Sequence, residues 1–184
     1  MKIHFVTKNL HKINEAKEIL KEFNIDVEQI AEDKYEPKEL SLKDVAEYNA
    51  KFFYEKYKKP VIVDDTGVFF KAYKDFPGSH PKLMFDLLGY KGLLKLLEGE
   101  NRDAQFRTCV GYCDENGVRI FDGILKGKID TKINNADEDF LPYERIFLIN
   151  GRPMSNLSRD EKNKISHRAD SLKKLGQFLT QKKI

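Results

Sequence analysis

The most restrictive feature of the sequence is a short apolar run that ends in two adjacent aspartates. Val61-Ile62-Val63 is continuous and β-branched, which is the pattern of a strand buried on both faces. Asp64-Asp65-Thr66-Gly67 follows directly, so we expect two carboxylates at the carboxyl end of a core strand. Adjacent buried carboxylates cost stability unless a cation or hydrogen-bond donors compensate them. Mg²⁺ prefers such oxygens and keeps waters for a substrate phosphate, so the pair could hold this ion. The alternative interpretation is that one aspartate caps the following turn and the other is solvated.

Strands and helices are expected to alternate along the rest of the chain. We expect strands over residues 2–7, 27–31, 61–63, 104–113, 118–129 and 146–149, with the turn of a hairpin at residues 114–117. We expect helices after the capping residue Asn9, between Ser41 and Pro60, between Gly78 and Gly99, after the capping box Ser158 to Glu161, and from near Ser166 onward.

Composition and charge indicate one globular domain over residues 1–184, with 40% hydrophobic and 34% charged residues. The net charge of +3 is too small and too evenly spread for a duplex-binding module, so we expect no nucleic-acid partner. No run of about 18 apolar residues could span a bilayer, so we expect no membrane association. No signal peptide is evident at the start, and we expect a cytoplasmic protein.

The cysteine and histidine positions indicate neither a disulfide nor a zinc site. Cys109 and Cys113 fall in one predicted strand, on the same face and about 13 Å apart. A disulfide needs Cα atoms within roughly 7 Å, so we interpret both as apolar strand residues. His4, His11 and His80 lack metal-ligand spacing.

Two further segments could bind a ligand. The loop from Thr7 to Lys12 offers helix-start amides and two lysines, which would suit a polyphosphate, although a solvated connection has the same pattern. Ser166-His167-Arg168 opens the last helix, so its donors could face a carbonyl-rich or anionic ligand. A capping serine with a surface histidine and arginine is the alternative.

Four blocks of the sequence, in order, resemble one family. They are residues 7–15, residues 60–67 with 76–78, residues 102–106, and residues 161–168. Together they look like the non-canonical purine nucleoside triphosphate pyrophosphatases, the inosine/xanthosine triphosphatase family. The Asp-Asp-Thr-Gly turn and the Ser-His-Arg block after Glu-Lys-Asn are the specific parts, and the resemblance covers nearly the whole chain.

The resemblance implies a fold, an assembly and an activity. The fold would be α/β, with a long mixed β-sheet and flanking helices that form two lobes around a central active-site cleft. The protein would be a homodimer. It would hydrolyse inosine, deoxyinosine and xanthosine triphosphates to monophosphate and pyrophosphate with Mg²⁺, in nucleotide-pool cleaning.

The resemblance also implies roles for individual residues. Asp65 would orient or deprotonate the attacking water beside the metal, and Asp64 and Glu36 would be further metal ligands, although Glu39 is close and Pro37 stands at the aligned position. The implied substrate contacts are Thr7, Lys8, Asn9 and Lys12 for the phosphates, Thr66 and Lys162, and Ser166, His167 and Arg168 for the base.

The sequence departs from the family pattern in two places. Lys8 stands where the family has glycine in the phosphate loop. Residues 140–147 match the family's aromatic, glycine-rich base segment at three of eight positions, with Leu141 in place of its stacking phenylalanine. Two alternatives follow: a relative with relaxed or shifted base specificity, and a non-catalytic nucleotide-binding protein. Pyrophosphate release from inosine triphosphate would distinguish the second from an enzyme.

Overall fold

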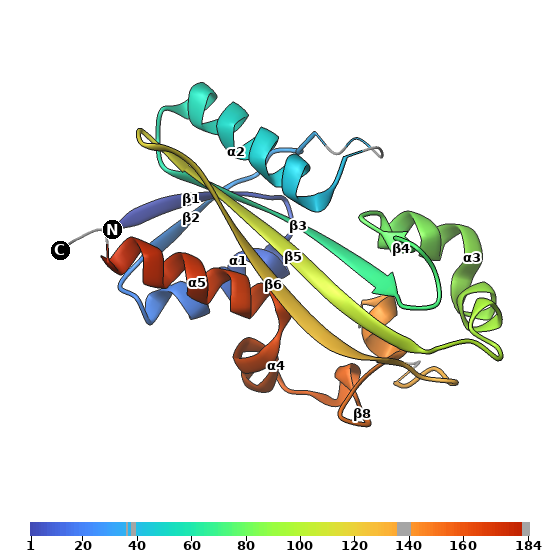
Figure 1. Cartoon of the computed structure of the whole chain (residues 1–184). Helices are drawn as coiled ribbons and strands as arrows, with labels where there is room; N and C mark the ends of the chain where they lie inside the picture. The colour runs from blue at the N-terminus through green and yellow to red at the C-terminus, as the bar shows by residue number, and fades with distance from the viewer. Residues whose placement is uncertain (36, 38–39, 136–140, 182–184) are drawn as a thin grey trace.

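A single mixed sheet organises the molecule (Figure 1). The computed structural model describes residues 1–35, 37, 40–135 and 141–181. Within this part of the chain the strands are β1 (Lys2–Val6), β2 (Asp26–Ile30), β3 (Val61–Phe70), β4 (Pro77–Gly78), β5 (Asp103–Asp114), β6 (Gly117–Ile129), β7 (Phe147–Ile149) and β8 (Arg152–Pro153). The helices are α1 (Leu10–Lys21), α2 (Leu42–Tyr57), α3 (Pro81–Leu96), α4 (Arg159–Ile165) and α5 (His167–Gln181), with 3₁₀ turns at Pro142–Arg145 and Met154–Asn156.

The strand order is β2-β1-β3-β5-β6-β7-β8, and β4 pairs with β3. β1 lies parallel to β2 and β3, and every other pairing is antiparallel. The long strands β3, β5 and β6 run from one end of the molecule to the other (Figure 1).

Helices cover the sheet in two groups, which form two lobes. At one end of the long strands, α1 and α5 pack on one face of the sheet and α2 packs on the other. At the other end, a separate apolar cluster joins α3 to β5, β6 and the two 3₁₀ turns. The predicted α/β fold with a long mixed sheet and two lobes is confirmed.

Helix starts and inward faces follow the sequence closely. The Asn9 side chain accepts hydrogen bonds from the first amides of α1, and Ser158 with Glu161 forms a complete capping box at α4. The apolar residues that recur at helical spacing in α1 are all buried: Ile13, Ala16, Ile19 and Leu20.

The predicted end of the strand before the two aspartates, at Val63, is wrong. β3 does not stop before Asp64 but continues to Phe70, because β5 pairs with it at every residue from Val61 onward. β1, by contrast, pairs only with Val61 and Ile62. The two aspartates therefore lie in the middle of a strand, where β3 extends past its parallel neighbour.

The helical tract after Gly78 is also less regular than predicted. Gly89 has φ 59° and ψ −175°, a conformation that interrupts α3 and that glycine adopts without a Cβ clash. Leu93 is the buried residue of this helix, whereas Leu87 is 69% exposed.

Cys109 and Cys113 are buried, free thiols on β5, as predicted. Both belong to the cluster beneath α2, and the Cys109 thiol also donates a hydrogen bond to Asp122, with 3.0 Å between sulfur and oxygen.

Among the described residues, no helix combines the length and apolar character needed to cross a bilayer.

Candidate active site

A cleft of about 1050 Å³ lies between the two lobes. It gathers eight of the predicted site residues from three separate segments of the chain: Thr7, Lys8, Asn9, Lys12, Asp65, Thr66, His167 and Arg168. The second lobe contributes apolar and aromatic side chains, among them Phe85, Leu141 and Tyr143. One end of the cleft is therefore cationic and the other end is ring-lined.

The loop between β1 and α1 is shaped by its own hydrogen bonds. The Asn9 amide donates to Thr7 Oγ1 at 3.1 Å, and Asn9 Oδ1 accepts from the amides of His11 and Lys12 at 2.9 and 3.3 Å. Two helix-start amides that we expected to face a ligand are therefore satisfied within the loop. The lysine side chains remain at the cleft, with Lys8 paired to Asp33 at its edge.

Asp64 is the buried centre of an ionic cluster. Its side chain is 1% exposed, and its two oxygens accept from Lys12 Nζ at 2.8 Å and from Arg168 Nε at 2.9 Å. Burial opposes its ionisation, but the charges of Lys12, Arg168 and Lys34 outweigh burial and lower the pKa of Asp64 below its usual range. Asp64 is thus ionised at neutral pH and holds two cations in place.

Glu15 is a member of this cluster that the sequence analysis missed. It accepts from Arg168 Nη1 at 2.6 Å and from Ser166 Oγ at 3.1 Å, so it joins α1 to the start of α5. Lys12 and Glu15 are three residues apart on one helix and therefore share a face. The three-residue spacing from Lys12 is the sequence signal that could have identified Glu15.

Asp65 points away from this cluster because adjacent strand residues face opposite sides. Its side chain is 11% exposed and borders the cleft. Lys34 Nζ lies 3.9 Å from Asp65 Oδ1 and donates to the main-chain oxygen of Asp64. The sequence analysis did not predict Lys34 as a site residue.

Asp65 fits the Mg²⁺-ligand role that the family resemblance predicts for it, although the described residues do not complete a metal site around it. No group of three histidine, cysteine or acidic side chains that could hold a metal occurs in the described residues. Both Asp64 oxygens already bind cations, so Asp64 does not fit its predicted ligand role in this arrangement. Asp65 borders the cleft, and Mg²⁺ commonly takes one or two carboxylates plus substrate phosphates and water. The predicted ligand Glu36, and its neighbour Glu39, lie outside the described residues.

His167 sits where the cleft meets the core. Its ring stacks on Phe106, with centroids 4.8 Å apart and an interplanar angle of 14°. The start of α5 approaches β6 closely: a Cβ on Gly123 would lie 1.8 Å from the His167 carbonyl oxygen, so this position requires glycine. His167 Nδ1 is buried and has no hydrogen-bond partner among the described residues. A bound ligand could supply one.

A pH dependence of stability follows from His167. Burial, and then the charge of Arg168, lower its pKa well below the usual 6.5, so the folded protein holds it neutral. The unfolded chain binds this proton near pH 6.5 and the folded chain does not, so stability is complete above pH 6.5 and is lost as the pH falls below it. We expect a loss of about 1.4 kcal/mol per pH unit from this group.

Urea unfolding between pH 7.5 and 5.5 measures this loss. His167→Phe keeps a ring against Phe106 and should show a shallower decline than the parent protein. Parallel curves for the two proteins would exclude His167 as the source of the dependence.

Lys162 and Ser166 lie in an adjoining pocket rather than in the cleft itself. This pocket is about 340 Å³ and shares Glu144, His167 and Arg168 with the cleft. Lys162 Nζ bonds Glu144 Oε2 at 2.7 Å, which ties α4 to the turn that carries Leu141 and Tyr143. Ser166 Oγ caps α5 by accepting from the Ala169 amide at 3.0 Å.

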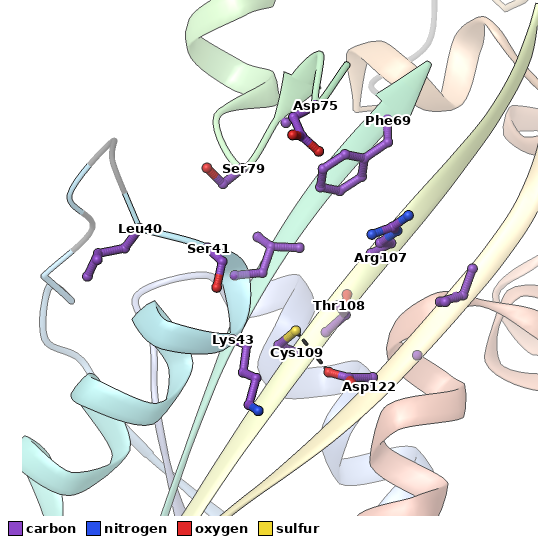
Figure 2. Close-up of a pocket in the computed structure, with 14 residues that line it drawn as sticks. Leu40, Ser41, Lys43, Phe69, Asp75, Ser79, Arg107, Thr108, Cys109 and Asp122 are labelled. Carbon is purple, nitrogen blue, oxygen red and sulfur yellow. Dashed lines mark hydrogen bonds between the residues drawn. The ribbon is translucent and has the colours of Figure 1, made fainter. Parts of the chain in front are cut away.

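A third cavity, shown in Figure 2, has a different lining. It measures about 550 Å³ and lies between the start of α2, with Ser41 and Lys43, and the strand residues Arg107, Cys109 and Asp122. None of the predicted site residues that the structure describes lines it. Burial and the hydrogen bond to Asp122 raise the pKa of the Cys109 thiol, which leaves that sulfur protonated and unreactive.

Curated proteins resemble this chain over nearly its whole length. The "dITP/XTP pyrophosphatase" of Methanopyrus kandleri is 39% identical over 182 residues, which cover 97% of this chain and 96% of that protein. The protein of the same name from Saccharolobus solfataricus is 38% identical over 183 residues, covering 97% and 94% of the two chains.

Two solved structures share the fold. A HAM1 protein from Coxiella burnetii superimposes with a TM-score of 0.81 at 23% identity, covering 98% of this chain and 99% of that one. The Staphylococcus aureus Ham1 protein superimposes with a TM-score of 0.76 at 22% identity, covering 99% and 100%. The model of the Ham1 family matches residues 3–178. Because the family model matches residues 3–178 and a curated relative is 39% identical over 97% of the chain, the chain belongs to the Ham1 family.

Proposed function

We propose that this protein hydrolyses non-canonical purine nucleoside triphosphates, namely the triphosphates of inosine, deoxyinosine and xanthosine, to monophosphate and pyrophosphate. The observation that carries the proposal is the cleft, which Asp65 lines together with lysines of the first lobe and aromatic rings of the second. The names of the relatives, "dITP/XTP pyrophosphatase", support the same substrate class.

The cationic end suits the phosphates. Lys8 and Lys12 border the cleft beside the Asn9-capped start of α1, where the helix dipole favours an anion. Asp65 is the carboxylate placed to orient the attacking water and accept its proton. A bound Mg²⁺ would neutralise phosphate charge there, and Asp65 is the described residue that would hold it.

The ring-lined end suits the base. Phe85, Leu141 and Tyr143 supply apolar walls, and His167 presents an unpartnered ring nitrogen nearby. A purine 6-keto group accepts hydrogen bonds, whereas the 6-amino group of adenine donates them. Donors held rigidly by the Glu15 and Asp64 network at the start of α5 would therefore favour hypoxanthine and xanthine, because a donor left facing a donor is costly in a desolvated site.

A nucleotide panel tests this proposal. The protein is mixed with Mg²⁺ and inosine, xanthosine, adenosine or guanosine triphosphate, and pyrophosphate and monophosphate are quantified. We expect equal amounts of the two products, with rates highest for inosine and xanthosine triphosphates. Similar rates for all four purines would favour the relaxed-specificity alternative, and absence of pyrophosphate would favour a non-catalytic nucleotide-binding protein.

Leu141→Phe is expected to strengthen base binding. Leu141 is 60% exposed at the cleft and stands where the family has a stacking phenylalanine. An aromatic ring against the base is worth on the order of 1 kcal/mol, so KM for inosine triphosphate should fall about fivefold with little change in kcat. Leu87→Phe, at an exposed position that does not line the cleft, is the control. An unchanged KM in Leu141→Phe would place the base elsewhere.

The assembly and compartment are part of the same proposal. Family resemblance supports a homodimer, which light scattering of the purified protein at several concentrations would measure. The proposed substrates belong to the pool of free nucleotides, which supports a cytoplasmic location.

A further inference from the structure

We infer that, in the substrate-free enzyme, Lys34 occupies the side of Asp65 at which the metal ion would bind, so that the ion enters with the nucleotide rather than before it. This inference rests on the proposed function, because it assigns the metal to Asp65. It concerns a residue to which the family resemblance assigns no role.

Lys34 is a buried lysine at the edge of the cleft. Its side chain is 8% exposed, although lysine side chains are almost always largely solvated. Its ammonium lies 3.9 Å from Asp65 Oδ1 and also donates to the main-chain oxygen of Asp64. These two oxygens face it from consecutive residues of β3, so the ammonium is held at the place where Asp65 meets the cleft.

The backbone that carries Lys34 is fixed to α2. Asn49, which is 1% exposed, accepts from the Tyr35 amide at 2.9 Å and donates to the Tyr35 carbonyl at 2.7 Å. On the other side of Lys34, Glu32 accepts hydrogen bonds from Lys56 and Tyr57. The ammonium therefore reaches Asp65 from an anchored segment and not from a surface loop.

The charges of the cluster explain why Lys34 pairs with Asp65. Lys12 and Arg168 already engage both oxygens of Asp64, and Arg168 also engages Glu15. Lys34 is a third cation beside this cluster, and its ammonium lies 3.9 Å from Asp65 Oδ1. A divalent ion arriving alone at Asp65 would meet a like charge a few ångströms away. A triphosphate that arrives with the ion brings phosphate oxygens, and Lys34 can pair with these instead of with Asp65.

Binding of Mn²⁺ to the nucleotide-free protein, followed by electron paramagnetic resonance of the free ion, tests the inference without measuring activity. The variants are Lys34→Met, which keeps an unbranched side chain without charge, and the control Lys56→Met. Lys56 pairs with Glu32 of the same segment but does not border the cleft. Thermal unfolding of each variant shows whether it is folded, and Lys34→Gln replaces Lys34→Met if it is not.

We expect the dissociation constant for Mn²⁺ to fall about tenfold in Lys34→Met and to stay unchanged in Lys56→Met, since only the first change removes a like charge beside the ion. Adding Asp65→Asn to Lys34→Met should abolish the gain. Equal affinity in the parent protein and Lys34→Met, whether tight or weak, would overturn the inference. The proposed function fails separately, if the parent protein releases no pyrophosphate from any purine triphosphate in the panel.

Discussion

Replacing Asp65 with asparagine is expected to lower the turnover of inosine triphosphate by about 10²–10⁴-fold and to leave the fold intact. The loss follows from its position, since Asp65 is the acidic residue of β3 that borders the cleft, and general-base catalysis contributes about that factor. The amide has the same shape as the carboxylate and removes only the charge that would hold a metal and accept a proton. The Asp65 side chain is 11% exposed and lies 3.9 Å from Lys34 Nζ, whereas that of Asp64 is 1% exposed and meets two cations at 2.8 and 2.9 Å, so Asp65→Asn should cost less stability than Asp64→Asn.

The measurement is kcat for pyrophosphate release, with circular dichroism and thermal unfolding to show that the variant is folded. Asp86→Asn is the matched control, because Asp86 also borders the cleft but pairs only with the exposed Lys82 among the contacts described for it. Its kcat should stay near that of the parent protein. Near-normal turnover in Asp65→Asn would remove Asp65 from the mechanism.

Local chemistry made much of the fold predictable. The caps Asn9 and Ser158 identify helix starts because their side chains satisfy free amides whatever the rest of the chain does. The Asn-Gly pair predicts the hairpin between β5 and β6 because few sequences suit so tight a turn. The helical spacing of apolar residues in α1 predicts its buried face for a similar reason.

The length of β3 could not be predicted in this way. Asp64, Asp65 and Gly67 are poor strand residues, and they are extended because β5 pairs with them across the whole segment. Pairing of that kind is set by tertiary structure. Ending the strand at Val63 also concealed the alternation that sends Asp64 and Asp65 to opposite faces.

The candidate site was predictable in its residue types and less so in its partnerships. Lys12, Asp65 and Arg168 could be chosen because charged groups at turns and helix starts suit a phosphate ligand. Glu15 and Lys34 could not, because their positions depend on how α1 and the segment before α2 fold against β3. Distances across the fold, rather than spacing along the chain, make them part of the site.

Replacing Asp64 with asparagine should cause a large loss of unfolding free energy, whereas Asp65→Asn should mainly lower turnover. Asp64 is the shared partner of Lys12 and Arg168, whose side chains are 19% and 13% exposed. Removing one member of a buried ionic cluster leaves uncompensated charge, which costs about 3–5 kcal/mol. Urea unfolding at pH 7 measures this cost, and Asp65→Asn, one residue away on the opposite face of the strand, is the control that should lose much less.

The pH dependence gives this prediction a second test. The pKa of Asp64 is lowered in the folded protein, so its contribution is complete above the unfolded value near 3.9 and is lost as the pH falls below it. The difference in unfolding free energy between the parent protein and Asp64→Asn should therefore be constant from about pH 7 to 5 and should shrink below about pH 4. Because asparagine cannot titrate, only the parent protein should change through this group. Equal losses in Asp64→Asn and Asp65→Asn, or a difference that does not shrink in acid, would mean that Asp64 is not the ionised centre of the cluster.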